Sequence, residues 1–185
     1  MSEDGQLLEN YARRGDVESL AALVSRHRVW MGAMLRGMLG CAADAEDAFQ
    51  NAWIRVMKSA ARYRGGSVRA YLASAARTAA IDLMRRRGRT VDFDFASAGG
   101  HGEAVEVADP SPTPDELFES EAAAEDVRRA LMELPEGQRQ VLLMRIEAEL
   151  SFKEIADVLG VPIGTALTWM HSARENLKKR LGRAV

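Results

Sequence analysis

The chain has 185 residues, of which 47% are hydrophobic and 28% charged, so it can bury the core of one or two small domains. No apolar run approaches the roughly 18 residues of a membrane helix. The first residues lack a basic stretch followed by an apolar one, so we expect neither membrane insertion nor a secretory signal. The single cysteine, Cys41, rules out an intrachain disulfide and is typical of a cytoplasmic protein; we expect an ordinary, partly buried thiol.

The net charge of −2 conceals three segments of different charge. Residues 1–89 have a net charge of +6, residues 90–125 a net charge of −10 without any Lys or Arg, and residues 126–185 a net charge of +2. The middle segment also holds three of the five prolines and few apolar residues, which is typical of a linker. The pattern predicts two basic domains joined by an acidic flexible linker.

Four helices are predicted in the first domain, and the first of them covers residues 3–13. Asp16 is a good N-cap for the second helix, which Gly40 ends, and Asp44 is a good N-cap for the third. A basic, glycine-containing loop then leads to a fourth helix over residues 68–87, which ends in three arginines.

The second domain contains a predicted helix-turn-helix. After helices over residues 126–133 and 135–147, Ser151 and Glu154 form a capping-box pattern, and Gly160 can end that short helix in the left-handed conformation. A longer helix follows the turn, and this arrangement commonly places a helix in the DNA major groove. Because no segment shows the alternation of a strand, the sequence predicts an all-α fold of two small helical domains.

Catalytic chemistry is not predicted. The three histidines are scattered, without the spacing of metal ligands, and the chain has no glycine-rich phosphate loop and no nucleophile elbow. Acidic residues cluster at helix starts, where the helix dipole explains them. We therefore expect no enzyme, no cofactor and no bound metal.

The composition of residues 62–89 favours nucleic acid as a partner. They contain eight arginines and one acid, Asp82, with Tyr63 and Tyr71 between the arginines. Guanidinium groups bind phosphates and aromatic rings stack on unpaired bases, so this composition suits a single strand. A solvated basic helix face would have the same composition, so composition alone leaves both interpretations open.

Five motifs, in order along the chain, resemble those of the bacterial extracytoplasmic-function (ECF) sigma factors, the smallest sigma subunits of RNA polymerase. They are DAEDAFQNAW from Asp44, RYRGGS from Arg62 followed by AYL, the stretch from Arg77 to Arg86, LPEGQRQVL from Leu134, and SFKEIA with GVPIGT in the helix-turn-helix. The resemblance covers nearly all of the chain except the predicted linker. It implies an alternative sigma factor that directs promoter-specific initiation, with region 2 in residues 1–89 and region 4 in residues 126–185.

The resemblance implies docking of the first domain on the clamp helices of the largest polymerase subunit, and of the second domain on the flap of the second subunit. The residues implied at the clamp contact are Asp44, Asp47, Gln50 and Trp53. For Trp53, a place in the core of the domain is an equal alternative.

The resemblance further implies that the first domain melts the −10 promoter element and binds the non-template strand. The residues implied are Arg62, Arg64, Ser67, Tyr71, Arg77, Thr78, Arg85 and Arg86. A flipped base needs a pocket and an aromatic face, and its backbone needs guanidinium groups, so these residue types are suitable. Thr78 and Tyr71 stand where the family usually has asparagine and tryptophan.

By the same resemblance, the long helix of the helix-turn-helix binds the −35 element. The residues implied are Thr165, Leu167, Thr168, Trp169, His171, Ser172, Arg174 and Lys178. The family usually has Lys or Arg at the positions of Leu167, Trp169 and Ser172, so conventional base readout should be weakened. The inward stripe of the helix is predicted to be Ala166, Met170, Ala173, Leu177 and Leu181.

Two other functions remain open at this point. In one, the chain is a sigma-like interaction protein that binds a regulator through the outward pair Leu167 and Trp169 without reading DNA. In the other it is a simple helix-turn-helix repressor, which leaves the docking motif and the arginine-rich segment unexplained. Because members of the family are commonly silenced by anti-sigma factors, the resemblance implies such a partner beside core RNA polymerase and promoter DNA.

Overall fold

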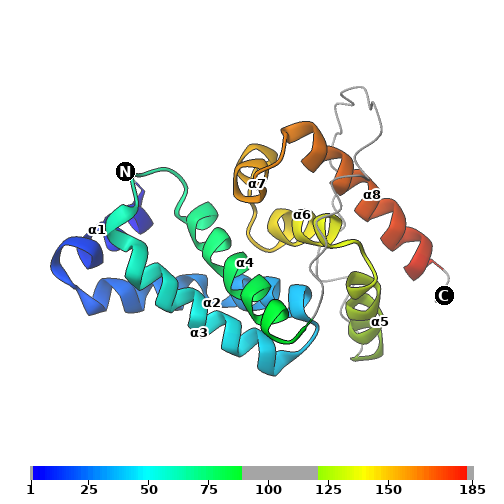
Figure 1. The fold of residues 1–185 in the computed structure, drawn as a ribbon, viewed down its shortest axis with the longest axis horizontal. Helices are drawn as coiled ribbons and strands as arrows, with labels where there is room; N and C mark the ends of the chain where they lie inside the picture. Colours follow the sequence, from blue (N-terminus) through cyan, green and yellow to red (C-terminus); the bar gives the residue numbers. More distant parts are fainter. Residues whose placement is uncertain (1, 89–120, 183–185) are drawn as a thin grey trace.

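The computed structural model describes residues 2–88 and 121–182, and every regular element within them is helical (Figure 1). The first group of helices is α1 (Glu3–Arg14), α2 (Val17–Leu39), α3 (Ala42–Ser59), the short 3-10 helix η1 (Ala60–Arg62) and α4 (Val68–Arg86). The second group is α5 (Glu121–Met132), α6 (Glu136–Ile146), α7 (Phe152–Leu159) and α8 (Ile163–Leu181). The predicted all-α fold is confirmed.

Several helix ends lie where the sequence signals place them. Asp16 accepts a hydrogen bond of 3.1 Å from a backbone N–H in the first turn of α2. Ser151 and Glu154 form the reciprocal capping box at the start of α7. Gly40 and Gly160 end α2 and α7 with φ angles of 72° and 69°, a region that costs other residues roughly 1–2 kcal/mol. Local chemistry therefore fixes the lengths of both helices.

The start of α3 differs from the prediction. The helix begins at Ala42, with Cys41 at the N-cap position and no side-chain cap. Asp44 lies buried in the first turn instead, where its carboxylate forms an ion pair of 2.6 Å with Nη1 of Arg87 at the end of α4. Because its carboxylate pairs with Arg87, Asp44 does not cap α3. The predicted partial burial of Cys41 is also wrong, since Cys41 is exposed.

Each group of helices packs around its own central helices. In the first group, α3 lies along α2 and α4, and α1 packs on α2; in the second, α6 contacts α7 and α8 (Figure 1). Alanines on the inner side of α4 allow α3 to approach closely, and Met31, Met34 and Leu35 of α2 fill the space between them. These contacts bury the inner side of α4, the helix of the arginine-rich segment, within the first group.

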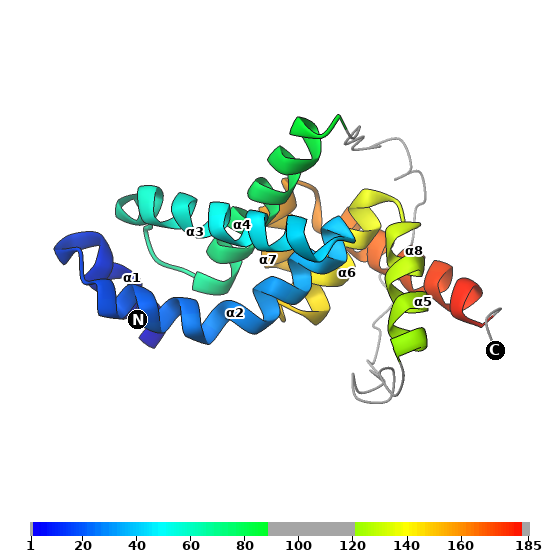
Figure 2. The same ribbon diagram turned by 90° about the horizontal axis from the view of Figure 1, so that it is seen from below.

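The two groups also pack on each other. α2 contacts α5 and α6, and α4 contacts α7 (Figure 2). Buried residues of both groups belong to one continuous apolar cluster. One close approach is at Gly37 of α2, where an added Cβ would lie 2.5 Å from Cδ2 of Leu143 in α6. The absence of a side chain at Gly37 therefore permits this contact.

The segment between the two groups was predicted to be an acidic linker. Its residues 90–120 lie outside the described residues, and residues 121–125 belong to α5. Within the described ranges, no helix combines the length and the apolar character that are needed to cross a membrane.

Candidate nucleic-acid interface

The outward side of α3 presents part of the predicted docking motif. Asp47 and Gln50 are exposed and lie about one turn apart. Two apolar side chains continue this stripe along the helix, Ile54 at 41% exposure and Met57 at 38%. The sequence analysis missed both as site residues, although their spacing from Asp47 and Gln50 follows one helix face.

Two residues assigned to polymerase docking do not lie on this surface. Trp53 is buried and packs edge-on against Phe49, with ring centroids 6.2 Å apart. Asp44 is buried beneath its ion pair with Arg87. Asp44 and Trp53 are therefore not on the outward side of α3, and for Trp53 the structure agrees with the alternative of a core residue.

The loop before α4 is held by its own hydrogen bonds. The Tyr63 hydroxyl donates to the Gly66 carbonyl at 2.7 Å, and Nη1 of Arg64 donates to the Ala61 carbonyl at 2.9 Å. Ser67 caps α4 by accepting from the backbone N–H of Ala70 at 3.2 Å. Arg62 and Arg64 are both exposed, so their charges face solvent.

Two tyrosines lie together below this loop. The rings of Tyr63 and Tyr71 have centroids 5.5 Å apart, and the Tyr71 hydroxyl is 2.6 Å from Oγ of Ser59. Tyr71 is half-buried, which leaves only part of its ring for a base. Burial raises the pKa of Tyr63, so its hydroxyl is neutral at physiological pH. The hydroxyl of Thr78 is used within α4, where it donates to the Ser74 carbonyl at 2.8 Å.

The C-terminal end of α4 carries exposed cations. Arg85 and Arg86 are exposed, and both line an open hollow of about 410 Å³ between α3 and α4. Arg55 of α3 and Asp82 of α4 form an ion pair at the same hollow. The guanidinium groups of Arg85 and Arg86 can both reach an anion bound in this hollow. The carboxylate that lines it, Asp82, is already paired with Arg55.

Arg77 and Ser67 have partners in the second group of helices. Nε of Arg77 donates to Oε1 of Gln140 in α6 at 2.7 Å, and burial lowers the pKa of this half-buried arginine. Hydrogen bonds from Ser151, and more weakly from Ser67, lower the pKa of Glu154 in α7. Of the residues predicted at the −10 strand, Arg62, Arg64, Arg85 and Arg86 are open to solvent, while Arg77 and Ser67 face α6 and α7.

The outward side of α8 carries a continuous stripe. Leu167, His171, Arg174 and Lys178 are all exposed at spacings of three or four residues, and Ile163 begins the stripe at 50% exposure. Further predicted contacts on this helix are half-buried: Thr165, Thr168 and Ser172. The Thr168 hydroxyl donates to the Gly164 carbonyl at 2.9 Å. The stripe is apolar at its N-terminal end and cationic further along.

The placement of Trp169 on the DNA-binding side of α8 is wrong. Trp169 is 5% exposed and packs on Gly137 of α6, where an added Cβ would lie 2.8 Å from Cζ3 of its ring. The inward stripe of α8 is therefore wider than predicted, because Gly137 leaves room for a large ring. The proposed partner-binding pair of Leu167 and Trp169 does not exist as a surface.

Among residues 2–88 and 121–182, His, Cys, Asp and Glu side chains form no group of three that could hold a metal ion.

Known families and structures match this arrangement. Residues 23–90 match sigma-70 region 2, and residues 124–177 match sigma-70 region 4. The chain is 26% identical over 172 residues to the ECF RNA polymerase sigma factor SigW of Bacillus subtilis, an alignment that covers 91% of this chain and 92% of that relative.

Two solved structures share the fold. The structure of CnrH in complex with the cytosolic domain of CnrY has a TM-score of 0.73 at 21% identity and covers all of both chains. The structure of the sigma factor RpoE in complex with the anti-sigma factor NepR, from Bartonella quintana, has a TM-score of 0.66 at 21% identity and covers 88% of this chain and 96% of that one. With regions 2 and 4 both matched in sequence, the chain belongs to the sigma-70 family and is an ECF RNA polymerase sigma factor.

Proposed function

We propose that this ECF sigma factor directs initiation through three separate surfaces: the outward side of α3 for core RNA polymerase, the arginine-rich segment for the −10 strand, and the outward side of α8 for the −35 duplex. The observation that carries the proposal is the stripe on α3. There Asp47 and Gln50 of the docking motif are exposed together with Ile54 and Met57. Exposed apolar side chains beside polar ones are typical of protein-binding surfaces.

For polymerase, we assign the contact to Asp47, Gln50, Ile54 and Met57. The two polar residues give orientation through hydrogen bonds, and the two apolar residues add buried area when the clamp helices cover them. Region 4 is assigned to the flap of the second subunit, as the family resemblance implies.

For the −10 element, we assign phosphate binding to the exposed Arg62, Arg64, Arg85 and Arg86. The paired rings of Tyr63 and Tyr71 supply an aromatic surface beneath the loop. Charge-assisted hydrogen bonds from guanidinium groups hold a backbone, while a ring accepts any flipped base.

For the −35 element, we assign α8 as the recognition helix. Leu167 and Ile163 can contact thymine methyl groups, while Arg174 and Lys178 can bind phosphates on either side. His171, Thr165, Thr168 and Ser172 complete the surface. The readout is therefore more apolar than in family members with cations at these positions.

We assign to this chain an anti-sigma partner as well, acting in the cytoplasm where core polymerase is found. Support comes from the RpoE structure, whose title names such a complex with NepR. A partner of this kind would have to cover one of the three surfaces.

The test of the proposed function is reconstitution with core RNA polymerase. Purified chain should co-elute with core polymerase and start transcription at promoters found by mapping transcript starts after overexpression. Asp47→Ala and Gln50→Ala should weaken co-elution, and Glu9→Gln on α1 serves as the control. Failure to bind core polymerase with no inhibitor present would exclude a sigma function. The interaction-only alternative loses its main support, since Trp169 is buried.

A further inference from the structure

A cluster of contacts between the two groups of helices lies on α4, beside the exposed arginines assigned to the −10 strand. The strand face is defined here as Ser67, Arg69 and Arg77, which lie on the side of α4 turned toward α6 and α7. The cover is defined as α6, α7 and the loop between them, residues 147–151. A role for this face presupposes that the arginine-rich segment binds the −10 strand, as proposed above.

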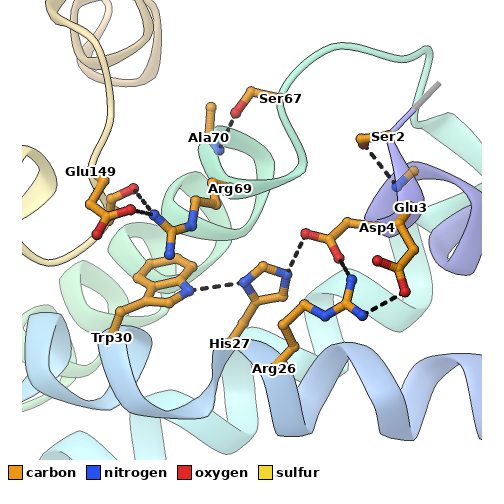
Figure 3. Close-up of polar contacts among 12 residues, drawn as sticks. Ser2, Glu3, Asp4, Arg26, His27, Trp30, Ser67, Arg69, Ala70 and Glu149 are labelled. Carbon is orange, nitrogen blue, oxygen red and sulfur yellow. Dashed lines mark hydrogen bonds and ion pairs between the residues drawn. The ribbon is translucent and has the colours of Figure 1, made fainter.

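The cover places carboxylates against the strand face. Nη1 of Arg69 forms an ion pair with Glu149 and also donates to the Ala148 carbonyl at 3.4 Å (Figure 3). Arg77 donates to Gln140, whose Nε2 in turn donates to Oε1 of Glu136 at 2.6 Å. Burial raises the pKa of Glu136, while the nearby Arg139, Arg77 and Arg85 hold it down.

The third contact lies at the start of α4. The carboxylate of Glu154, which forms the capping box with Ser151, lies near the Ser67 hydroxyl at that end of the helix. Glu149 pairs directly with Arg69, Glu136 is linked to Arg77 through Gln140, and Glu154 lies near Ser67. The Glu149 carboxylate thereby occupies the place that a strand phosphate would need on Arg69.

Arg69 is held in position from both sides. Its guanidinium lies over the ring of Trp30, 5.8 Å from the centroid, and the Trp30 Nε1 donates to Nδ1 of His27 at 2.9 Å (Figure 3). Nε2 of His27 lies 3.0 Å from a carboxylate oxygen of Asp4 in α1. Because the ring and its support are buried, the guanidinium remains oriented when its acidic partner leaves.

Glu149 is the strained member of the pair. Its φ angle is 51°, and within residues 2–88 and 121–182 no other non-glycine residue has a positive φ. Such a conformation is unfavourable for an L-residue and persists where surrounding contacts compensate it. The ion pair with Arg69 is such a contact.

We propose that in the free chain the cover occupies the strand face, with Glu149 in the place of a promoter phosphate on Arg69, and that the cover must leave before the −10 strand binds. Arg69 is thereby a strand ligand outside the set that the sequence identified. The outward side of α8 stays exposed in the closed chain, because α8 packs on α5, α6 and α7 through its other side. The closed chain can therefore meet −35 duplex, whereas full binding of the −10 strand waits for the cover to leave Arg69.

The pairs that hold the cover can be displaced. The Glu149 side chain is 70% exposed and that of Arg69 35%, so salt screens their attraction. A strand supplies several phosphates at once, which together compete with three separate carboxylates. The tight packing of Gly37 against Leu143 opposes opening, and this contact offers a place to lock the chain.

The first experiment measures binding of a short fluorescein-labelled single-stranded oligodeoxynucleotide of mixed sequence by the full chain. Glu149→Gln should bind it about twofold to fivefold more tightly than the wild type, the effect expected for one exposed ion pair. Glu9→Gln removes the same charge from the exposed pair with Arg13 on α1 and serves as the matched control. Equal affinities of the two variants would overturn the proposal.

The second experiment tests Arg69 itself. In the Glu149→Gln background, Arg69→Gln should weaken binding and reduce the slope of log K against log salt by about 0.7, the value for one phosphate of a single strand. An unchanged slope would remove Arg69 from the strand ligands.

The third experiment locks the cover. Gly37→Cys and Leu143→Cys, in a Cys41→Ser background, place two thiols where α2 and α6 are in close contact. The oxidised chain should bind the oligonucleotide more weakly than the reduced chain and recover on reduction, with cross-linking followed on a non-reducing gel. Oxidised chain that binds as well as reduced chain would overturn the proposal; if the variant fails to fold, the Glu149→Gln comparison still decides.

Failure of the cover is distinguishable from failure of the proposed function. If reduced chain binds the strand and starts transcription with core polymerase, and the oxidised chain does the same, the sigma function stands and only the cover is excluded. If the reduced chain and Glu149→Gln both fail to bind strand and to initiate with core polymerase, the −10 assignment is wrong and the cover falls with it.

Discussion

Trp169 of α8 packs directly on Gly137 of α6, so that the ring fills the space a side chain would take. An added Cβ at Gly137 would lie between 2.8 and 2.9 Å from three ring atoms, closer than carbon atoms approach. This contact fixes the rotation of α8 about its axis. Through that rotation it determines that Leu167 and His171, rather than Trp169, are exposed on the outward side of α8.

Gly137→Ala should therefore destabilise the chain. Overpacking a core costs about 1–3 kcal/mol, while alanine gains roughly 0.5–1 kcal/mol over glycine in a helix, so the net effect is a loss. Urea unfolding followed by circular dichroism measures it. Gly164→Ala in α8 is the matched control, because no atom lies within 4 Å of its added Cβ. An equal or higher stability for Gly137→Ala would contradict the packing described.

Asp44→Asn should lower stability without a direct effect on docking. The substitution removes the charge from a buried carboxylate that pairs with Arg87 at 2.6 Å. A loss of about 1–2 kcal/mol is expected, since Arg87 remains half-exposed and can be solvated. Asp47 lies one turn further along α3 and is exposed. Asp47→Asn should therefore change the free energy of unfolding by less than about 0.5 kcal/mol and weaken core polymerase binding instead.

Comparing the two variants separates the roles. Chemical unfolding reports on Asp44, and co-elution with core polymerase reports on Asp47. If Asp44→Asn left stability unchanged and abolished docking, its burial would have no structural role and the original assignment would be restored.

His27 should make stability depend on pH. Burial lowers its pKa, the Asp4 carboxylate opposes that effect, and the nearby Arg69 and Arg26 add to it. Trp30 donates to Nδ1, a bond that requires this nitrogen to be unprotonated. The folded state therefore keeps His27 neutral below the ordinary histidine pKa of about 6.5.

The sign follows from proton uptake by the unfolded chain. Below about pH 6.5 the unfolded state binds a proton that the folded state does not, so the free energy of unfolding falls as pH decreases, by at most about 1.4 kcal/mol per pH unit. The measurement is urea unfolding between about pH 7.5 and 5.5, taken as the difference from His27→Gln. Glu136 and Glu147, whose pKa values are raised by burial, act in the opposite direction but cancel in that difference. A difference that does not vary with pH would exclude the neutral buried histidine.

The helices were predictable from sequence because their signals are local. The caps at Asp16 and Ser151 and the glycines after α2 and α7 act on residues within about four positions. Such interactions are the same in every fold that contains the helix. The all-α fold and most helix bounds therefore followed from the sequence.

The errors concern contacts between residues far apart in the chain. Asp44 was predicted to be a cap and a docking residue because its partner is distant in the sequence. That partner, Arg87, follows the C-terminal end of α4. Trp169 was predicted to face outward because helical periodicity does not reveal the space that Gly137 leaves on α6. Nothing in the sequence pairs Arg69 with Glu149 either, since an exposed arginine and an exposed glutamate have many alternatives.

The recognition helix offers a further prediction, in which its apolar and cationic ends act differently. Leu167 is 43% exposed and lies where an aliphatic side chain can contact thymine methyl groups. Leu167→Ala should reduce the preference of the chain for thymine over uracil in a −35 duplex, because uracil lacks only that methyl group. Arg174→Ala and Lys178→Ala should instead weaken binding to all sequences and lower the salt slope by about 0.9 each.

These variants distinguish base readout from phosphate contact on one helix. Fluorescence anisotropy with matched thymine and uracil duplexes, at several salt concentrations, gives both quantities in the same assay. Glu175→Gln serves as the control, since Glu175 is exposed on α8 beside Arg174 but carries no assigned contact. If Leu167→Ala kept the full preference for thymine, the apolar end of α8 would not read the methyl groups. Specificity would then have to come from His171 and the hydroxyl-bearing residues Thr165, Thr168 and Ser172.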